Sequence, residues 1–171
     1  MYNYREKALH VNNMQSLIID AMHERKEHLI QELLDINLDN VDSVAMRNEI
    51  IDEIRILSTL NSDTENLMDS TDKESKEQLE VALNKVYSQV MDVASTVSLE
   101  EAIWANIQSI YLEALDRSWI THLDNLHHLR EGINIRGYGQ EDPYRLYAFD
   151  ALHTFDEMLQ AFFRDIIRHF L

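Results

Sequence analysis

Three pairs of an aspartate and a histidine have the residue types and the spacing that come closest to a metal site. The pairs are Asp20 with His23, Asp124 with His127, and Asp150 with His153. A separation of three residues places both side chains of a pair on one face of a helix. Helical bundles with two-metal sites use Glu-x-x-His pairs from two helices and single glutamates from two others. Aspartate is shorter than glutamate, and each pair lies beside an apolar stripe rather than within it. We therefore expect solvated or capping histidines and no metal site.

Other catalytic arrangements find no support in the sequence. A loop that cradles the phosphates of ATP needs the pattern Gly-x-x-x-x-Gly-Lys, which does not occur. No serine stands in the Gly-x-Ser-x-Gly context of a nucleophile elbow, and no Ser, His and acid set can be assembled. Cysteine is absent, which excludes disulfides and thiolate metal sites and fits a reducing compartment. We expect this chain to have no catalytic residue, no cofactor and no ATPase activity of its own.

The turn-forming residues, glycine and proline, are unusual in this sequence because they all lie in one segment. The chain has three glycines and one proline, and all four lie between Gly132 and Pro143. Average proteins contain roughly 7% glycine and 5% proline, so the loops must be few and the helices long. Tyr138 stands between Gly137 and Gly139, whose backbone freedom would let the ring be exposed. A phenol has an apolar face and a hydrogen-bonding end, so it can grip a polypeptide without reading its sequence.

Two arginines, Arg130 and Arg136, lie next to this glycine-rich segment. They put positive charge at the distal end of an acidic protein, which suits docking onto a partner. An alternative is that Tyr138 packs back on its own hairpin and that the arginines contact helix-terminal carbonyls. The larger aromatic residues upstream, Trp104 and Trp119 with Tyr111, are typical of core or groove packing.

The elements that position these residues are predicted to be all helical. Apolar residues recur at helical spacing from Tyr4 to Leu34, which predicts one long helix over 1–34. Region 35–75 is acidic and contains a shorter helix from Val41 to Leu60. Helical periodicity resumes in 76–97.

The remaining segment, 98–171, is predicted to form an antiparallel helix hairpin. Ser98-Leu-Glu-Glu101 has the form of a capping box that starts a helix. The apolar stripe of this helix includes Ile103, Ile110 and Leu123 and ends near the first glycine. A second stripe follows Pro143 to the chain end. A short connector between two long stripes leaves only an antiparallel arrangement.

Charge and hydropathy restrict the partners. With 31 acidic against 15 basic residues, the formal net charge is -16, which would repel nucleic acid and anionic lipid headgroups. No apolar run approaches the roughly 20 residues of a membrane-spanning helix, and the N-terminus lacks a signal-peptide pattern. We expect a soluble chain with no nucleic-acid partner and no transmembrane segment.

The hairpin sequence closely resembles the two-helix finger of SecA, the protein-translocase ATPase of bacteria. In that family the pattern reads W-x-x-H-x-D, then L-R-x-G-I-x-L-R, then G-Y or A-Y, then Q, and D-P or N-P. The matching residues are Trp119, His122, Asp124, Leu129, Arg130, Gly132, Ile133, Arg136, Tyr138, Gln140, Asp142, Pro143, Tyr147 and Phe155. Residues 3–14 resemble the entry to the family's scaffold helix, with Val11-Asn12-Asn13 in place of Tyr-Asp-Asp.

By this resemblance the chain divides into four regions of the family. They are the scaffold helix 1–34, the helical wing 35–75, the scaffold return helix 76–97, and the two-helix finger with its terminal helix 98–171. No family motif is matched in the wing. Leu146 and Asp150 stand where the family commonly has glutamate. Both an accessory second SecA and a divergent housekeeping copy are compatible with these departures.

The resemblance implies a mechanical role. Gly137, Tyr138, Gly139 and Gln140 would contact the translocating, unfolded preprotein, and Arg130 and Arg136 would contact a SecY-type channel complex. ATP and Mg²⁺ would bind in the motor domains of the parent protein, which this chain does not include. The parent would be cytoplasmic and peripherally associated with the cytoplasmic face of the bacterial membrane. A stand-alone helical adaptor that binds a protein partner without a motor is the alternative, and an upstream Walker motif in frame would distinguish the two.

Overall fold

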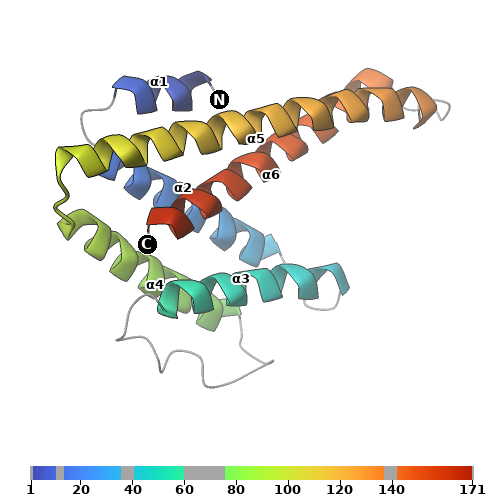
Figure 1. Ribbon diagram of the computed structural model, residues 1–171. Coiled ribbons are helices and arrows are strands. Elements are labelled where there is room, and N and C mark those ends of the chain that lie inside the picture. The colour runs from blue at the N-terminus through green and yellow to red at the C-terminus, as the bar shows by residue number, and fades with distance from the viewer. Residues whose placement is uncertain (1, 11–13, 36–40, 60–75, 137–141, 171) are drawn as a thin grey trace. The chain divides into compact units, whose positions relative to one another are not determined.

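A computed structural model describes residues 2–10, 14–35, 41–59, 76–136 and 142–170 of the chain. Within these ranges it contains helices and no strands, which confirms the all-helical prediction (Figure 1). The helices are α1 (Tyr2–His10), α2 (Met14–Asp35), α3 (Val41–Thr59), α4 (Lys76–Thr96), α5 (Glu101–Arg136) and α6 (Pro143–Phe170). They form two compact units. One contains α1, α5 and α6, and the other contains α2 from Gln15 onwards, α3 and α4.

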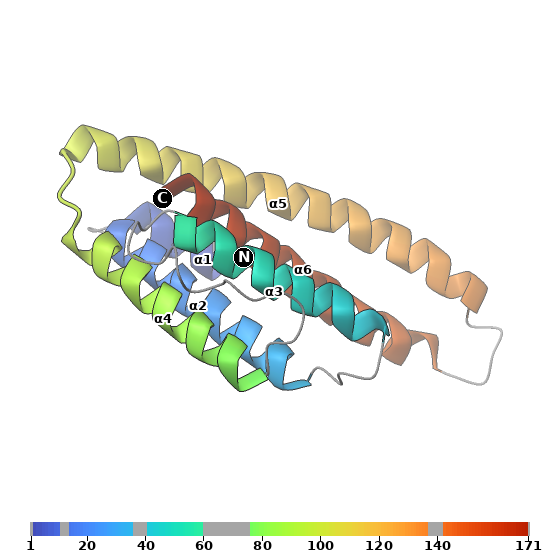
Figure 2. The same ribbon diagram turned by 90° about the horizontal axis from the view of Figure 1, so that it is seen from below.

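The first unit is built on the antiparallel pair α5 and α6, the two longest helices in Figure 2. Trp104 near the start of α5 stacks on Phe170 at the end of α6, with ring centroids 6.0 Å apart. Further along α5, the ring of Tyr111 meets the edge of Phe162 at 5.1 Å. The apolar side chains between the helices are buried: Tyr111, Leu115, Leu159, Phe162, Phe163, Ile166 and Ile167. The predicted hairpin and its aromatic packing are thereby confirmed.

Helix α1 packs on α5 rather than continuing into α2 as one described helix. The guanidinium of Arg5 donates two hydrogen bonds to the carboxylate of Asp116, at 3.0 and 3.3 Å. The side chain of Gln108 donates to the carbonyl of Ala8 at 2.6 Å. The sequence predicted a single helix from Tyr4 to Leu34, but the structure has two, with residues 11–13 outside the described residues. Helical periodicity cannot distinguish these cases, because it does not say which partner each turn packs against.

In the second unit, α2 and α4 run antiparallel and are joined near both ends. The Gln15 side chain, at the start of α2, donates to the carbonyls of Ala94 and Val97 at 2.6 and 3.2 Å. At the opposite end, the Lys76 ammonium donates to the carbonyl of Leu34 at 3.0 Å. Helix α3 packs beside α4 and buries an apolar face of Ile50, Ile54 and Leu57. The expected bounds of α3 and α4 agree with the structure to within one residue.

The start of α5 differs from the sequence prediction. The carbonyl of Glu100 accepts the first backbone hydrogen bonds, from Ile103 and Trp104 at 2.9 and 3.2 Å. The helix therefore begins at Glu101, and the capping box predicted at Ser98 lies two residues too early. Residues 97–100 are not helical.

The end of α5 also differs, because the helix continues through Gly132 to Arg136. The predicted tip from Gly132 to Pro143 is therefore too long at its first end. Glycine costs about 1 kcal/mol relative to alanine inside a helix but does not stop one unless the chain changes direction. A Cβ atom added at Gly132 would meet nothing within 4 Å.

Replacing Gly132 with alanine should therefore raise the free energy of unfolding by about 0.5–1 kcal/mol. Urea unfolding followed by tryptophan fluorescence measures it, since both tryptophans lie on α5. As a control, Ala105→Gly on the exposed face of the same helix should lower stability by a similar amount. A stability loss in Gly132→Ala would contradict the helical assignment.

Candidate functional site

The candidate site is the distal end of the α5–α6 hairpin. Helix α5 ends at Arg136, and α6 begins at Pro143. Gly137, Tyr138, Gly139 and Gln140 lie outside the described residues, so their contact roles stay predictions.

Of the two arginines predicted at this end, only Arg130 has a described side chain. It is exposed on α5, near the end of the helix. Arg136 is the last helical residue of α5, and its contact role stays a prediction as well. The structure thus places Arg130 where a partner could reach it.

The start of α6 is fixed by Asp142 and Pro143. The backbone N–H of Tyr144 donates to Oδ1 of Asp142 at 3.1 Å, and the N–H of Leu146 donates to the Asp142 carbonyl at 3.2 Å. Asp142 is therefore the N-cap, and Pro143 takes the first helical position, where its missing N–H costs nothing. The Asp-Pro pair in the sequence is itself a helix-start signal, and it marks the first residue of α6 more closely than the apolar stripe that follows Pro143.

Several large apolar side chains on this half of the hairpin are exposed. On α6 these are Tyr144, Phe149 and Leu152, and on α5 they are Ile120 and Leu123. Leu123 was assigned to the buried stripe of α5, as were Ile103 and Ile110, and all three are exposed. Helix α6 covers only one face of α5. The apolar stripe of α5 drifts around the helix over many turns, so some of its residues lie outside the covered face.

A groove of about 310 Å³ lies between α5 and α6 around His122. Its lining residues are Arg117, Ser118, Thr121, His122, Asn125, Thr154, Glu157, Met158 and Ala161. The His122 side chain is buried against the rings of Trp119 and Phe155, with centroids 5.4 and 5.6 Å away. Its Nδ1 atom has no hydrogen-bond partner among the described residues. In the sequence His122 is recognisable only as part of a motif, because its burial depends on α6.

Burial lowers the pKa of His122 below its ordinary value of 6.5, because desolvation disfavours the imidazolium. The folded state therefore binds this proton less readily than the unfolded state does. The contribution of neutral His122 to the free energy of unfolding is fully present above pH 6.5. It declines as the pH falls through the folded-state pKa of this histidine. Arg117 and Glu157, which line the same groove, carry opposite charges.

We expect the wild-type hairpin to lose more stability between pH 7 and pH 5 than the variant His122→Phe. The variant places an uncharged ring among the same aromatic neighbours, so that part of the pH dependence should disappear. Urea midpoints from tryptophan fluorescence at several pH values measure the difference. The variant His10→Phe, at an exposed position on α1, should keep the wild-type slope. Equal slopes for all three proteins would contradict the burial effect.

The Asp-x-x-His pairs do not assemble into a metal centre in the described part of the chain. No group of three or more His, Asp or Glu side chains there could hold a metal ion. Two of these histidines instead pair with a glutamate one turn further along: His127 with Glu131, and His153 with Glu157, each at 3.4 Å.

None of the described helices combines the length and the apolar character that crossing a membrane requires. The described part of the hairpin thus offers an exposed arginine, exposed apolar side chains and a groove around His122.

Comparison with known proteins gives one consistent family. The family described as the SecA Wing and Scaffold domain matches residues 1–171. Proteins named protein translocase subunit SecA are similar over nearly the whole chain. The relative from Halothermothrix orenii is 29% identical over 170 residues, covering 99% of this chain and 19% of the relative. The one from Paraburkholderia xenovorans is 31% identical over 178 residues, covering 98% and 18%. That from Syntrophobacter fumaroxidans is 28% identical over 172 residues, covering 98% and 20%.

The chain thus spans about a fifth of the length of the curated relatives that it matches. No solved structure matches it.

Proposed function

Because this chain belongs to the SecA wing and scaffold family, we propose that it is the scaffold, wing and finger region of a SecA-like preprotein translocase. Its finger contacts the translocating polypeptide and a SecY-type channel during ATP-driven export. The observation that carries this proposal is the family match over residues 1–171, together with the α5–α6 hairpin on which the finger motif lies.

The hairpin supports a positioning role. Helix α5 is continuous from Glu101 to Arg136, and α6 packs along it through a buried aromatic face. A helix rises about 1.5 Å per residue, so a braced pair of this length carries its distal end far from its base. Arg130 presents positive charge towards that end and would dock on acidic groups of the channel.

Tyr138 is the residue proposed to touch the polypeptide, flanked by Gly137 and Gly139 and followed by Gln140. An unfolded preprotein offers backbone amides and varied side chains. A tyrosine ring supplies apolar contact and one hydrogen bond without requiring a particular sequence. This suits a carrier of many substrates.

The energy for polypeptide transport would come from other domains of the parent protein. The 171 residues contain no phosphate-cradling glycine motif, so ATP and Mg²⁺ are assigned to motor domains of the parent. The parent would work at the cytoplasmic face of the bacterial membrane, next to the channel. The contribution of this region is to hold and direct the finger.

The test is preprotein transport into SecY-containing vesicles by the full-length parent carrying Tyr138→Ala. Transport should fall strongly, while ATP hydrolysis without preprotein stays near the wild-type rate. Tyr2→Ala is the control, since that tyrosine is 73% exposed and lies on α1, which is not part of the proposed contact surface. It should leave transport unchanged.

Normal transport by Tyr138→Ala would refute the contact role of Tyr138. A parent that lacks ATP hydrolysis and transport altogether, yet still binds a protein through the hairpin, would support the adaptor alternative instead.

A further inference from the structure

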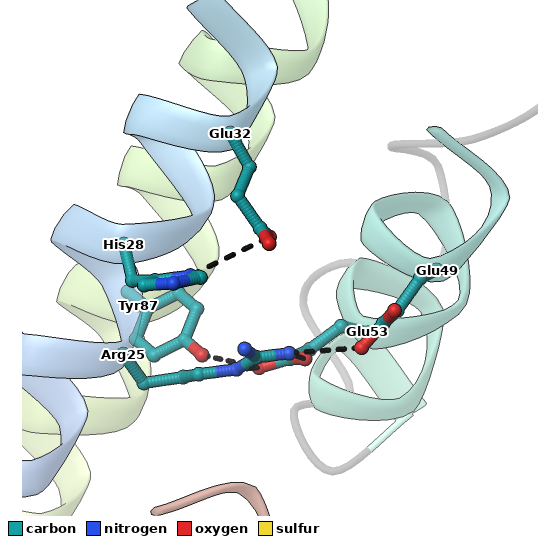
Figure 3. A network of polar contacts seen from close by, with 6 residues as sticks. All are labelled: Arg25, His28, Glu32, Glu49, Glu53 and Tyr87. Carbon is teal, nitrogen blue, oxygen red and sulfur yellow. Dashed lines mark hydrogen bonds and ion pairs between the residues drawn. The ribbon is translucent and has the colours of Figure 1, made fainter. Parts of the chain in front are cut away.

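Three charged or polar side chains are buried together in the second unit, one from each of its helices. Arg25 lies on α2, Glu53 on α3 and Tyr87 on α4, and their side chains meet (Figure 3). Their exposed fractions are 2%, 5% and 0%. We call them the buried polar cluster. Charged residues are almost never this deeply buried unless they are paired. The cluster lies apart from the hairpin and is not used by the proposed function.

The pairing in the cluster is directional. Arg25 donates to both carboxylate oxygens of Glu53, from Nε at 3.2 Å and from Nη2 at 2.7 Å. The Tyr87 hydroxyl donates to Oε1 of the same carboxylate at 2.5 Å. The Glu53 carboxylate therefore accepts hydrogen bonds from both neighbouring helices at once. The planar guanidinium of Arg25 and the hydroxyl of Tyr87 can both donate to the Glu53 carboxylate only when α3 has one particular orientation.

The protonation states fit these donor roles. Burial alone would lower the pKa of Arg25, but the hydrogen bond and the charge of Glu53 outweigh it and leave that pKa raised. Burial and the nearby Glu53 carboxylate raise the pKa of Tyr87 well above its ordinary value. Near neutral pH the arginine is therefore charged and the tyrosine keeps its proton.

The apolar residues of α3 do not define one buried face strongly. Ile50, Ile54 and Leu57 are buried, whereas Ile51 is only half-buried. Successive residues lie about 100° apart around a helix, so Ile51 is on one flank of the buried face and Glu53 on the other. Turning α3 towards Ile51 would move a charge out of the interior and an isoleucine into it. Non-directional burial would favour that turn.

We propose that the buried polar cluster fixes the rotational position of α3 on the α2–α4 pair, and that it does so at a net cost in stability. Desolvating an arginine and a glutamate commonly costs more than their attraction returns, and apolar replacements of similar volume are often neutral or stabilising. The benefit is specificity. The apolar core holds α3 in place, and the cluster selects one orientation.

The test compares the 171-residue chain with the triple variant Arg25→Met, Glu53→Leu, Tyr87→Phe. Its urea midpoint, followed by circular dichroism, should equal or exceed the wild-type value. Nitrogen–proton correlation spectra should show multiple or broadened signals for α3 amides but single signals for α4. Hydrogen exchange of α3 amides should accelerate by about tenfold or more.

A matched control removes an exposed bidentate pair of the same kind. Arg5 and Asp116 join α1 to α5 with side chains 47% and 48% exposed. The variant Arg5→Gln, Asp116→Asn should leave α3 signals and exchange at their wild-type values. A triple variant with single α3 signals and wild-type protection would overturn the proposal. So would a triple variant that is less stable than wild type or fails to fold.

Discussion

Replacing Phe162 with alanine should lower the free energy of unfolding of the hairpin unit by about 3–5 kcal/mol. Phe162 is 1% exposed on α6. Its ring meets Tyr111 of α5 edge to face at 5.1 Å and lies 5.7 Å from the ring of Phe163. The truncation would leave a cavity between two long helices, which could close it only by moving closer together and disturbing their other contacts. This residue also supports the brace that the proposed finger needs.

The urea midpoint from tryptophan fluorescence measures this loss, because Trp104 and Trp119 both lie on α5. Phe149→Ala on the same helix is the matched control. Phe149 is 70% exposed, so its truncation should change stability by less than about 0.5 kcal/mol. Equal effects of the two truncations would show that the buried ring face does not hold the hairpin together.

The helices of this protein follow closely from helical periodicity in the sequence. The predicted bounds of α3 and α4 agree with the structure because those helices are regular and alternate apolar and charged residues. Boundaries that depend on single residues were less predictable. The sequence predicts that the helix stops at Gly132, although α5 passes through this residue. It also predicts a cap at Ser98, although α5 begins at Glu101.

Contacts between distant segments could not be deduced from periodicity. The pairing of Arg5 with Asp116 assigns α1 to the hairpin unit, and nothing in the local sequence indicates this partner. The exposure of Leu123 follows from the position of α6, which a stripe on α5 alone does not contain. The family resemblance identified the finger motif, but its residues from Gly137 to Gln140 lie outside the described structure.

Buried polar residues are the hardest to predict from a pattern. Arg25 and Glu53 have the spacing and type of ordinary surface residues on acidic helices, and nothing in the sequence around them indicates a role. Their burial depends on three helices meeting, with Tyr87 as the third contributor. A residue type that is rarely buried becomes buried only through partners that are remote in sequence.

The variant Glu53→Leu alone should lower the free energy of unfolding by about 3–5 kcal/mol, although leucine is the more apolar residue. The substitution leaves the guanidinium of Arg25, which is 2% exposed, without the carboxylate that holds it at 2.7 Å. The Tyr87 hydroxyl also loses its acceptor. Arg25 would keep the carboxylate of the half-exposed Glu49 as a partner, at 3.3 Å. The cost of a poorly compensated buried charge exceeds the gain from burying one leucine side chain, about 1.5–3 kcal/mol.

Urea unfolding by circular dichroism measures the effect, and Glu49→Gln is the matched control. Glu49 contacts the same arginine from one turn earlier on α3, at 3.3 Å, but its side chain is 50% exposed. Its loss should cost less than about 1 kcal/mol, because water can solvate the exposed side of that pair. If Glu53→Leu is as mild as Glu49→Gln, then Arg25 must escape to solvent when its partner is removed. In that case the interior of this unit tolerates rearrangement, and burial of the charge is not what makes Glu53 important.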